Sequence, residues 1–358
     1  MAEKTYGGGT PATSNEAFWN GNIPWIQSSD IVDGKMMGVE PRKYITQTGL
    51  NSSATQLVPK DSIAIITRVG VGKLAYMPFS YSTSQDFLSL SKLNTEPFFT
   101  VYACYKKLQS ELNTVQGTSI KGITKDELLA KTISVPVYSE QKQIGSFFTQ
   151  LDTLITLHQR KYEKLVNIKK SMLDKMFPKN GASVPKIRFK GFTDPWEQRK
   201  LGEMVDVCSG MDYKHLSEGD IPVYGTGGYM LSVNKALSYD RNAVGIGRKG
   251  TIDKPYILKA PFWTVDTLFY AIPKDSKNID FTFDVFQKVD WKKKDESTGV
   301  PSLSKIAINE TSISTPSKLE QERIGSFFRN LDTLITLHQR KLEKLQNIKK
   351  SCLEKMFV

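Results

Sequence analysis

Two stretches of the chain, residues 144–177 and 324–357, carry the same long alternation of apolar and polar positions. In each stretch the apolar side chains recur in steps of four and three residues, which is the seam of a helix that pairs with another helix. At an offset of 180 residues, 28 of the 34 positions are identical. Identity on this scale indicates an internal duplication, so we expect two copies of one architecture.

The seams predict which side chains lie between the paired helices. Lys169 interrupts the first seam, and Ile168 beside it is the expected substitute. At about 1.5 Å per residue, each predicted helix has a length of roughly 50 Å. The predicted seam residues are Phe148, Leu151, Ile155, His158, Tyr162, Leu165, Met172 and Met176 in the first copy, and Phe328, Leu331, Ile335, His338, Leu342, Leu345, Cys352 and Met356 in the second.

The relative direction of the two helices is the next question. A whole globular segment separates them, so the sequence permits parallel or antiparallel pairing. A duplicated chain closes most simply about a pseudo-two-fold axis, which favours antiparallel helices and places His158 near Leu342 and His338 near Tyr162. A polar residue at a seam position commonly fixes the register. The alternative for both histidines is a metal-binding or catalytic role.

The segments outside the helices have the mixed strand and helix pattern of α+β domains. In the first segment, residues 6–15 predict a loop, 63–67 a buried strand before a glycine turn, 87–93 a strand and 97–112 a helix. The predicted fold is therefore α+β, with two globular units in pseudo-two-fold arrangement joined by two long antiparallel coiled-coil helices. The predicted domains are a first unit at 1–139, a helix at 140–177, a linker at 178–198, a second unit at 199–319 and a second helix at 320–358.

The second unit repeats the order of motifs of the first unit more closely than it repeats the individual residues. GDIPVYGTGGY from Gly219 mirrors GNIPWIQSSD from Gly21, and residues 297–305 mirror 116–124 with a slip of two. At the offset of 180, Arg248 corresponds to Arg68, and Asp266 corresponds to Asp86. The framework repeats while the faces between diverge, which suits two related recognition tasks.

The balance of charges favours a polyanionic partner. The chain has 49 Lys and Arg residues against 37 Asp and Glu residues, a net charge of +12, which for a chain of this size indicates nucleic acid. The alternative is a basic protein from a lysine-rich proteome. The three cysteines lie far apart without metal or disulfide spacing, and neither a signal peptide nor a membrane-spanning apolar run is evident. We therefore expect a soluble, cytoplasmic protein without membrane contact.

No catalytic motif emerges from the sequence. The glycines at 7–9, 70–72 and 225–228 lack the flanking residues of dinucleotide or phosphate-loop sites, and the DPW at Asp194 lacks the second proline of an adenine methyltransferase motif. There is no HExxH and no Cys–His set. We interpret the chain as non-catalytic, with no cofactor of its own.

Contacts with nucleic acid suit the sequence better. Glycine turns beside basic residues let backbone N–H groups and a cation approach phosphates; Arg68 with Lys73 forms one such turn, and Arg248 with Lys249 another. Either arginine is alternatively a reader of guanine. For Trp25 and Tyr224 the alternative is a core aromatic, and for Lys293, within the run 292–294, it is a solvated face. The remaining candidates in the variable loops are Tyr6, Thr10, Gln27 and Ser28 in the first unit, and Tyr213, Lys214 and Thr226 in the second.

Together, the duplicated IGSFF–LDTLITLHQRK helix and the linker KIRFKGFTDPWEQRKLGE resemble the specificity subunit of Type I restriction–modification systems. GGTP, which includes Gly8, together with GNIPW and RVGVGK, is similar to elements of its target-recognition domains. The resemblance covers nearly the whole chain. One departure is that residues 184–202 precede only the second unit, so the chain is expected to be trimmed at its N-terminus.

The resemblance implies that each unit reads one half of a split double-stranded DNA sequence and that the helices set the gap between the halves. It implies two modification subunits, which carry S-adenosylmethionine and flip the target adenines, and it allows a restriction subunit with translocase activity. A second apolar stripe is expected to contact partner helices: Phe147, Leu154, Leu157, Phe327, Leu334 and Leu337. Two other interpretations stay open, the recognition part of a fused methyltransferase–nuclease and a coiled-coil adaptor that binds protein.

Overall fold

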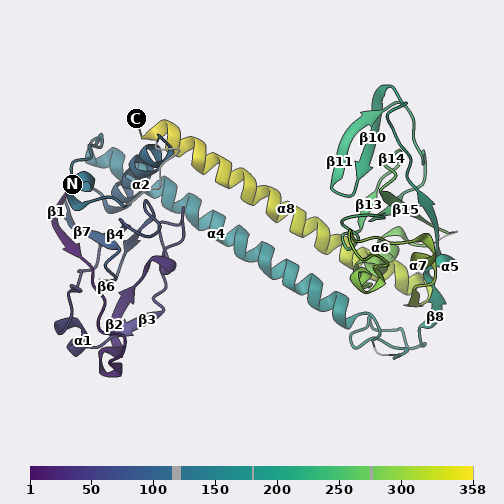
Figure 1. Cartoon of the computed structure of the whole chain (residues 1–358), viewed down its shortest axis with the longest axis horizontal. Coiled ribbons are helices and arrows are strands. Elements are labelled where there is room, and N and C mark those ends of the chain that lie inside the picture. Colours follow the sequence, from purple (N-terminus) through teal and green to yellow (C-terminus); the bar gives the residue numbers. More distant parts are fainter. Residues whose placement is uncertain (115–121, 180, 275–276, 358) are drawn as a thin grey trace. The chain divides into compact units, whose positions relative to one another are not determined.

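The computed structural model describes residues 1–114, 122–179, 181–274 and 277–357 (Figure 1). The chain divides into two compact units. Unit 1 comprises residues 1–160 and the C-terminal residues from Gln339, and unit 2 comprises residues 161–338. Both divisions fall inside the long helices α4 (Tyr138–Lys175) and α8 (Lys318–Met356). Each unit therefore contains a globular part and one half of each long helix.

Unit 1 is built on two sheets. The larger has the strand order β1-β7-β4-β5, with antiparallel neighbours throughout, and the smaller has the order β3-β2-β6. The elements are β1 (Ala2–Gly7), η1 (Glu16–Phe18), β2 (Trp19–Ile26), η2 (Ser28–Asp30), β3 (Lys43–Ile45), α1 (Gln47–Asn51), β4 (Ser62–Ile66), β5 (Leu74–Met77), β6 (Ser82–Thr83), β7 (Phe87–Leu93), α2 (Pro97–Thr114) and α3 (Lys125–Leu129).

Strand β4 shows why this sheet has both faces covered. Successive side chains of a strand point to opposite faces. Ile63 and Ile65 pack in the cluster that contains α2, whereas Ala64 and Ile66 pack in the cluster beneath the smaller sheet. The strand is therefore an unbroken buried run rather than an alternation of apolar and polar residues.

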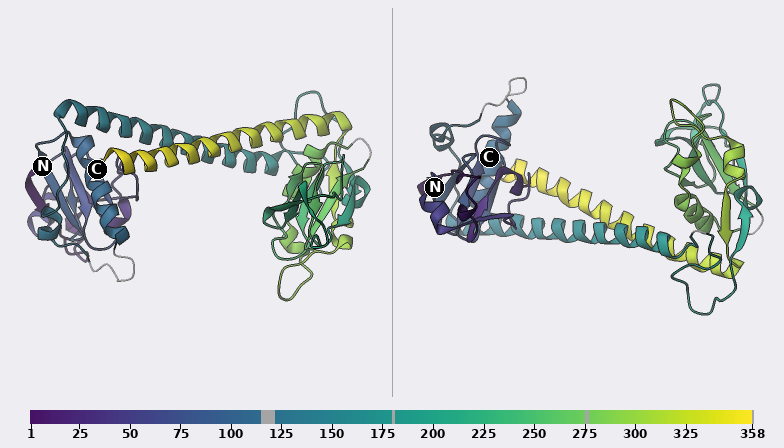
Figure 2. Two further views of the ribbon diagram at one scale, coloured as in Figure 1. Left: turned by 90° about the horizontal axis from the view of Figure 1, so that it is seen from above. Right: turned by 60° about the horizontal axis from the view of Figure 1, so that its bottom comes forward.

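Helix α4 closes against the start of α2 through a glycine. A Cβ on Gly145 would lie 2.8 Å from the backbone nitrogen of Phe99, so only glycine permits this approach. One turn later Phe148 is buried, with its ring centroid 5.0 Å from Tyr102 and 5.6 Å from Phe357. The end of α8 thus completes the core of unit 1 (Figure 2).

Unit 2 repeats the topology of unit 1. Its sheets have the orders β13-β12-β15-β9 and β11-β10-β14, and a further pair, β16-β8, has no counterpart among the described residues of unit 1. The elements are β8 (Glu197–Lys200), α5 (Leu201–Met204), β9 (Val205–Ser209), β10 (Glu218–Gly225), β11 (Gly228–Val233), β12 (Ala243–Gly247), β13 (Tyr256–Leu258), β14 (Trp263–Thr264), β15 (Leu268–Pro273), α6 (Ile279–Lys288), η3 (Trp291–Lys294), α7 (Lys305–Asn309) and β16 (Ser312–Thr315).

The two long helices run antiparallel within each unit. In unit 1, Phe148 and Asp152 of α4 meet Phe357, which directly follows α8, and Lys349 of α8, so one residue number rises as the other falls. In unit 2, Phe328 and Asp332 of α8 meet Phe177 and Lys169 in the same sense. The predicted fold class, α+β units joined by antiparallel helices, is confirmed. The histidine neighbours expected at the midpoint stay a prediction.

The predicted strand at 87–93 and the helix from Pro97 are confirmed, as is the buried strand from Ile63. The loop at 6–15 was wrong at its start, because Tyr6 and Gly7 pair with Ser89 and Leu88 as the end of β1. The long helices begin six residues before Ile144 and Ile324. Of the stretch 116–124, residues 116–121 lie outside the described part.

The seam differs from its prediction at the C-terminal end of the chain. Met356 is 40% exposed, and Leu353 and Phe357 contact the core in its place. In the first copy the equivalent Met176 is buried as predicted, so the difference is confined to the end of the second copy.

Candidate nucleic-acid interface

In unit 1, the loop between β6 and β7 brings several predicted residues together. A Cβ on Gly8 would overlap the carbonyl oxygen of Ser84, so the chain after β1 lies directly on this loop. The Thr10 hydroxyl donates a hydrogen bond to Oε1 of Gln85 at 2.6 Å. Gln85 was not predicted, and only its neighbour Asp86, as part of the repeat, pointed toward it.

Two further segments of unit 1 meet the same loop. The Ser84 amide donates to the carbonyl of Ile26 at 2.9 Å, which brings in the end of β2 with Gln27 and Ser28. The Thr67 amide donates to the carbonyl of Asp86 at 2.8 Å, which brings in the turn that starts at Arg68. The predicted residues of unit 1 thus gather at one end of its two sheets.

The side chains at this end differ in exposure. Arg68 is exposed and Lys73 is half-buried on the turn closed by the 2.9 Å hydrogen bond from Ile66 N to Lys73 O. Tyr6 is half-buried with the Lys4 ammonium 5.9 Å from its ring. Trp25 is only 4% exposed, and its indole N–H donates to the carbonyl of Gly9 at 3.0 Å. Burial favours the alternative for Trp25, a core aromatic that supports the loop.

Unit 2 has the same arrangement of loops with different side chains. A Cβ on Gly210 would overlap the carbonyl of Val265, and the Val265 amide donates to the carbonyl of Tyr224 at 3.0 Å. The Tyr224 ring is half-buried, with centroids 6.4 Å from Tyr229 and 6.1 Å from Tyr256. The other candidates lie nearby on loops: Tyr213 is half-buried, Lys214 is exposed, and Thr226 is half-buried in the turn between β10 and β11.

The basic turn of unit 2 is held more firmly than a bare loop. The Arg248 amide donates to the Thr267 carbonyl at 2.8 Å, and the guanidinium lies 5.7 Å from the ring centroid of Phe269. The Lys249 side chain is exposed, and its backbone forms an isolated antiparallel β-bridge with Ser302. Hydrogen bonds from the Ser302 and Ser297 amides hold the pKa of Asp295 below its usual range, so this carboxylate organises the supporting loop.

The two arginines do not occupy equivalent positions. Ile63 pairs with Leu90 in unit 1, whereas Val244 pairs with Ala271 in unit 2, so the residues of β4 and β7 recur 181 positions later in β12 and β15. Arg248 therefore corresponds to Thr67, whose amide makes the same contact, and Lys249 corresponds to Arg68. The predicted correspondences of Arg68 with Arg248 and of Asp86 with Asp266 were wrong, because β4 and β7 carry one more residue of offset than the long helices.

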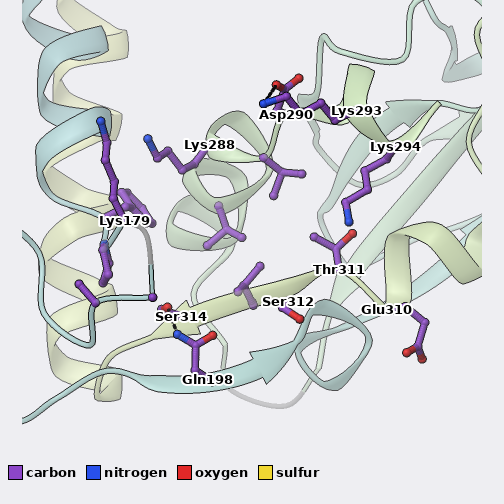
Figure 3. A pocket seen from close by; sticks show the side chains of 17 residues that line it. Lys179, Gln198, Lys288, Asp290, Lys293, Lys294, Glu310, Thr311, Ser312 and Ser314 are labelled. Atoms are coloured by element: carbon purple, nitrogen blue, oxygen red, sulfur yellow. Dashed lines mark hydrogen bonds and ion pairs between the residues drawn. The ribbon is translucent and has the colours of Figure 1, made fainter.

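Lys293 lies at a cavity of about 620 Å³ in unit 2 (Figure 3). The cavity lies between the linker, α6, η3 and β16, and four lysines line it: Lys179, Lys288, Lys293 and Lys294. Lys293 forms an ion pair with Asp290 at 3.4 Å, and its side chain is exposed. These lysines form a solvated basic rim, and contact of Lys293 with phosphate stays a prediction.

Most of the residues predicted for the seams of the long helices are buried or half-buried. Phe148, Leu151, Phe328, Leu331 and Leu342 are buried. Met176 is also buried. Apart from the exposed Met356, the remaining seam predictions are half-buried: Ile155, His158, Tyr162, Leu165, Met172, Ile335, His338, Leu345 and Cys352. The second apolar stripe is exposed at Phe147, Leu154, Leu157, Leu334 and Leu337, and half-buried at Phe327.

The lysine that interrupts each seam has a partner on the other helix. In unit 2, Lys169 Nζ lies 2.5 Å from Oδ1 of Asp332. In unit 1, Lys349 Nζ lies 2.5 Å from Oδ1 of Asp152 and 2.7 Å from the carbonyl of Gly34. These pairs were not predicted, although the antiparallel register brings a lysine of one copy to the aspartate of the other.

Within the described ranges no group of histidine, cysteine and carboxylate side chains is arranged to hold a metal ion. None of the helices described is both long and apolar enough to cross a membrane. The features of the site are instead loops gathered at one end of each unit's sheets and basic turns beside them.

Two α+β units of one topology, each carrying its own loop cluster, define a duplicated recognition scaffold. The model of the Type I restriction modification DNA specificity domain matches residues 1–167 and 193–347. The chain belongs to this family, and the match includes the globular part of each unit.

Curated relatives are similar to parts or most of the chain. The MjaIX specificity subunit of the Type I restriction enzyme from Methanocaldococcus jannaschii is 27% identical over 57% of this chain and 50% of its own length. The EcoR124I/EcoR124II specificity subunit from Escherichia coli is 30% identical over 45% and 44%. The chain thus spans about half the length of these two relatives. The EcoprrI specificity subunit from Escherichia coli is 23% identical over 96% and 88%.

Solved structures share the fold. The S subunit of a Type I restriction–modification system from M. genitalium has a TM-score of 0.72 at 17% identity, over 99% of this chain and 93% of its own. A chain from a structure on complex assembly of the type I R-M system has a TM-score of 0.50 at 15% identity, over 94% and 90%. At these identities the likeness concerns the fold alone.

Proposed function

We propose that this chain is the DNA sequence-recognition subunit of a Type I restriction–modification complex, and that each unit reads one half of a bipartite target. One observation carries the proposal: the DNA specificity domain occurs twice, with one topology and two unlike loop clusters. The relatives named above are specificity subunits of Type I restriction enzymes. Unlike loops on a common scaffold suit two different half-sites.

The charge of the chain supports double-stranded DNA as the ligand. A net charge of +12 and exposed Arg68, Arg248 and Lys249 beside glycine turns suit contact with phosphates or with guanine edges. Arg248 is the stronger candidate for a base contact, because Phe269 beneath its guanidinium limits its freedom.

The long helices suit a spacer. Helix α4 has 38 residues, and at about 1.5 Å per residue it is long enough to follow about one and a half turns of duplex. The exposed stripe on the same helices, with Leu154 and Leu334 at its centre, suits two modification subunits. We assign S-adenosylmethionine and the methylation of adenine to those subunits, and no chemical step to this chain. A restriction subunit with translocase activity is a further partner in this proposal.

Mapping of methylated sites tests the proposal. DNA from cells that express this chain with a cognate modification subunit is sequenced by a method that detects methyladenine. We expect a split motif with methyladenine in each half, and exchange of the globular part of one unit should change one half only. An assembled complex that neither methylates nor binds DNA would contradict DNA recognition and leave the coiled-coil adaptor.

The spacer role has its own test. The same four-residue insert in the middle of α4 and α8 lengthens both helices by about 6 Å. We expect the gap between the two half-sites to widen while both half-sites stay the same. An unchanged gap in a complex that still methylates would exclude the helices as the spacer.

A further inference from the structure

The loop between β14 and β15 joins several segments of the loop cluster of unit 2. The Met211 amide donates to the Thr264 carbonyl at 2.9 Å, and the Trp263 indole N–H donates to the Met211 carbonyl at 2.9 Å. The Val265 amide donates to the carbonyl of Tyr224 at 3.0 Å, which places the end of β10 on the same loop. Met211 and the end of β10 are therefore neighbours.

Strands β10 and β11 form a two-stranded hairpin at this place (Figure 1). Strand β11 lies at the edge of its sheet, and only Thr226 and Gly227 connect it to β10. A Cβ on Gly227 or on Gly228 would meet no atom of the described residues within 4 Å, beyond those of its chain neighbours. The turn of the hairpin therefore projects into open space.

Met230 has no partner of its own in this hairpin. Val223 of β10 pairs with Leu231 of β11. The next residue of β10, Tyr224, pairs with Tyr229, so Met230 is an extra residue of β11. A bulge of this kind redirects a side chain and is common beside functional sites.

The redirected side chain belongs to a patch of exposed apolar residues. The Met230 sulfur would lie 2.8 Å from a Cβ on Gly225, so the glycine makes room for it, and the Val265 side chain would lie 3.5 Å from the same Cβ. Met211, Tyr229 and Met230 are 54%, 63% and 50% exposed. These three side chains form what we call the apolar patch, beside the loop between β14 and β15.

The equivalent part of unit 1 has a different chemical character. The Gly9 amide donates to the Thr83 carbonyl at 2.9 Å, which is the contact that Met211 makes in unit 2, so a glycine takes the place of this methionine. After β2 the chain continues with Gln27 and Ser28 into the helical turn η2, whereas β10 returns at once as β11. Unit 1 thus presents hydrogen-bonding groups where unit 2 presents the apolar patch.

We propose that the apolar patch, Met211, Tyr229 and Met230, reads thymine methyl groups in the half-site of unit 2. Among the four bases, thymine alone carries a methyl group at its major-groove edge, and apolar side chains distinguish it by contact. The major groove also admits a two-stranded β-ribbon such as β10–β11. This inference rests on the proposed function, which supplies the DNA, and adds the chemical group that unit 2 recognises.

The neighbours of the patch suit DNA as the occupant. Exposed apolar patches also mark protein interfaces. Here, however, the basic turn lies on the same loop, because the Arg248 amide donates to the Thr267 carbonyl at 2.8 Å and its guanidinium donates to the Asp266 carbonyl at 3.5 Å. Lys249 beside it is exposed. Cations for phosphates and apolar groups for base edges together suit a DNA groove.

The test uses the assembled complex and its mapped target, in which exchange of one globular part identifies the half-site of unit 2. Each thymine of that half-site is replaced in turn by deoxyuridine, which removes the methyl group and keeps the hydrogen-bonding groups of the base. We expect binding about fourfold weaker at a thymine that the patch contacts, as the burial of one methyl group implies. Competition binding measures the ratio of the two affinities.

Substitutions in the patch decide whether it is responsible, because loss of a methyl group also alters the stacking of the bases. Met230→Ala should abolish the fourfold ratio at the thymine that Met230 contacts, and Met211→Ala and Tyr229→Ala are measured in the same way. Leu319→Ala removes another exposed apolar side chain of unit 2 and should keep the ratio. All four side chains are at least half exposed, so thermal melting should show unit 2 folded in each variant.

The outcomes separate this inference from the proposed function. Equal affinity of the unaltered complex for thymine and deoxyuridine at every position would overturn the inference and leave DNA recognition intact. A fourfold ratio that survives all three substitutions in the patch would also overturn it, because other groups would then contact the methyl. A complex that binds neither DNA would contradict the proposed function, and the inference with it.

Discussion

Unit 1 and unit 2 solve the same packing problem with different polar groups. In both units the seam lysine of one long helix pairs with an aspartate of the other, Lys349 with Asp152 and Lys169 with Asp332. A Cβ on Gly145 would lie 2.8 Å from the backbone nitrogen of Phe99, and a Cβ on Gly325 would lie 2.7 Å from that of Phe281, so α2 and α6 correspond at 182 residues. At this offset Tyr102 corresponds to Asp284. Both units therefore have the lysine–aspartate ion pair, but the residue beside it is Tyr102 in unit 1 and Asp284 in unit 2.

The third residue changes the electrostatics of each unit. The Tyr102 hydroxyl donates to Oδ2 of Asp152 at 2.6 Å, and burial together with the charge of Asp152 raises the pKa of Tyr102. Asp284 is buried, and burial raises its pKa well above the usual range despite the positive charge of Lys169. Unit 1 thus holds a neutral donor beside its ion pair, where unit 2 holds a buried carboxyl group that resists ionisation.

The largest expected effect tests whether the two units are stabilised independently. Phe148→Ala removes a fully buried ring from unit 1 and should lower the free energy of unfolding of that unit by about 3–5 kcal/mol. Phe328→Ala should do the same in unit 2. Hydrogen exchange resolved by residue is the measurement. Faster exchange in both units from either change would show that they unfold as one.

The next effect separates the two ion pairs. Lys349→Met leaves Asp152, whose side chain is 13% exposed, without its cation, and should cost about 3 kcal/mol. Lys169→Met should cost less, because the Asp332 side chain is 35% exposed and water can solvate it. Chemical denaturation followed separately in each unit measures both costs. Equal costs would show that exposure of the aspartate does not decide the difference.

A smaller effect distinguishes the two basic turns. Arg248→Ala should weaken binding of DNA by about 1–3 kcal/mol and relax specificity in one half-site, because Arg248 is held over Phe269. Arg68→Ala should weaken binding with little change in specificity, as expected for a contact with phosphate. Competition binding with each half-site scrambled in turn is the measurement. Equal loss of specificity from both changes would make the arginines equivalent despite the difference in register.

The smallest effect concerns the dependence of stability on pH. The folded-state pKa of Asp284 is raised, so the folded protein binds the proton more tightly than the unfolded chain. Its contribution to stability is therefore largest at low pH and is lost as the pH rises above the ordinary pKa of aspartate. Asp284→Asn should stabilise unit 2 by on the order of 1 kcal/mol at neutral pH.

The effect of Asp284→Asn at low pH serves as the control for its effect at neutral pH. Melting of unit 2 at pH 4 and pH 7 should show the gain from the substitution only at the higher pH. A gain of the same size at both values would mean that ionisation of Asp284 is not its cause. Unit 1, which has Tyr102 at this place, should show no change at either pH.

Much of this architecture was predictable from local pattern. The seam from Phe148 to Leu165, the strand at 87–93 and the helix from Pro97 follow from periodicity, which neighbouring residues carry along the chain. The candidate loop residues Thr10, Gln27, Arg68 and Tyr224 were also predictable as a set, and the structure gathers those of each unit at one end of its sheets.

Other features were not predictable, because contacts between distant residues decide them. A heptad pattern treats Lys169 as an interruption, whereas an aspartate 163 residues away makes it a partner. The sequence predicts Trp25 as a contact residue in a loop. In the structure its side chain is buried, and its indole N–H donates a hydrogen bond to the carbonyl of Gly9. Whether such a residue can contact a ligand depends on the exposure of its side chain, which the periodicity of the sequence does not reveal.

By itself the sequence determined the duplication, the α+β units, the paired helices and the basic character that indicates DNA. Only the tertiary structure decided that strands β4 and β7 recur at an offset of 181 residues and the two long helices at 180, so that Arg248 corresponds to Thr67. It also decided that Glu320 is buried under Arg188 while Glu140 is exposed. The physical reason is that register and burial arise from hydrogen bonds and packing between segments far apart in the chain, whereas periodicity records only which face of each element is apolar.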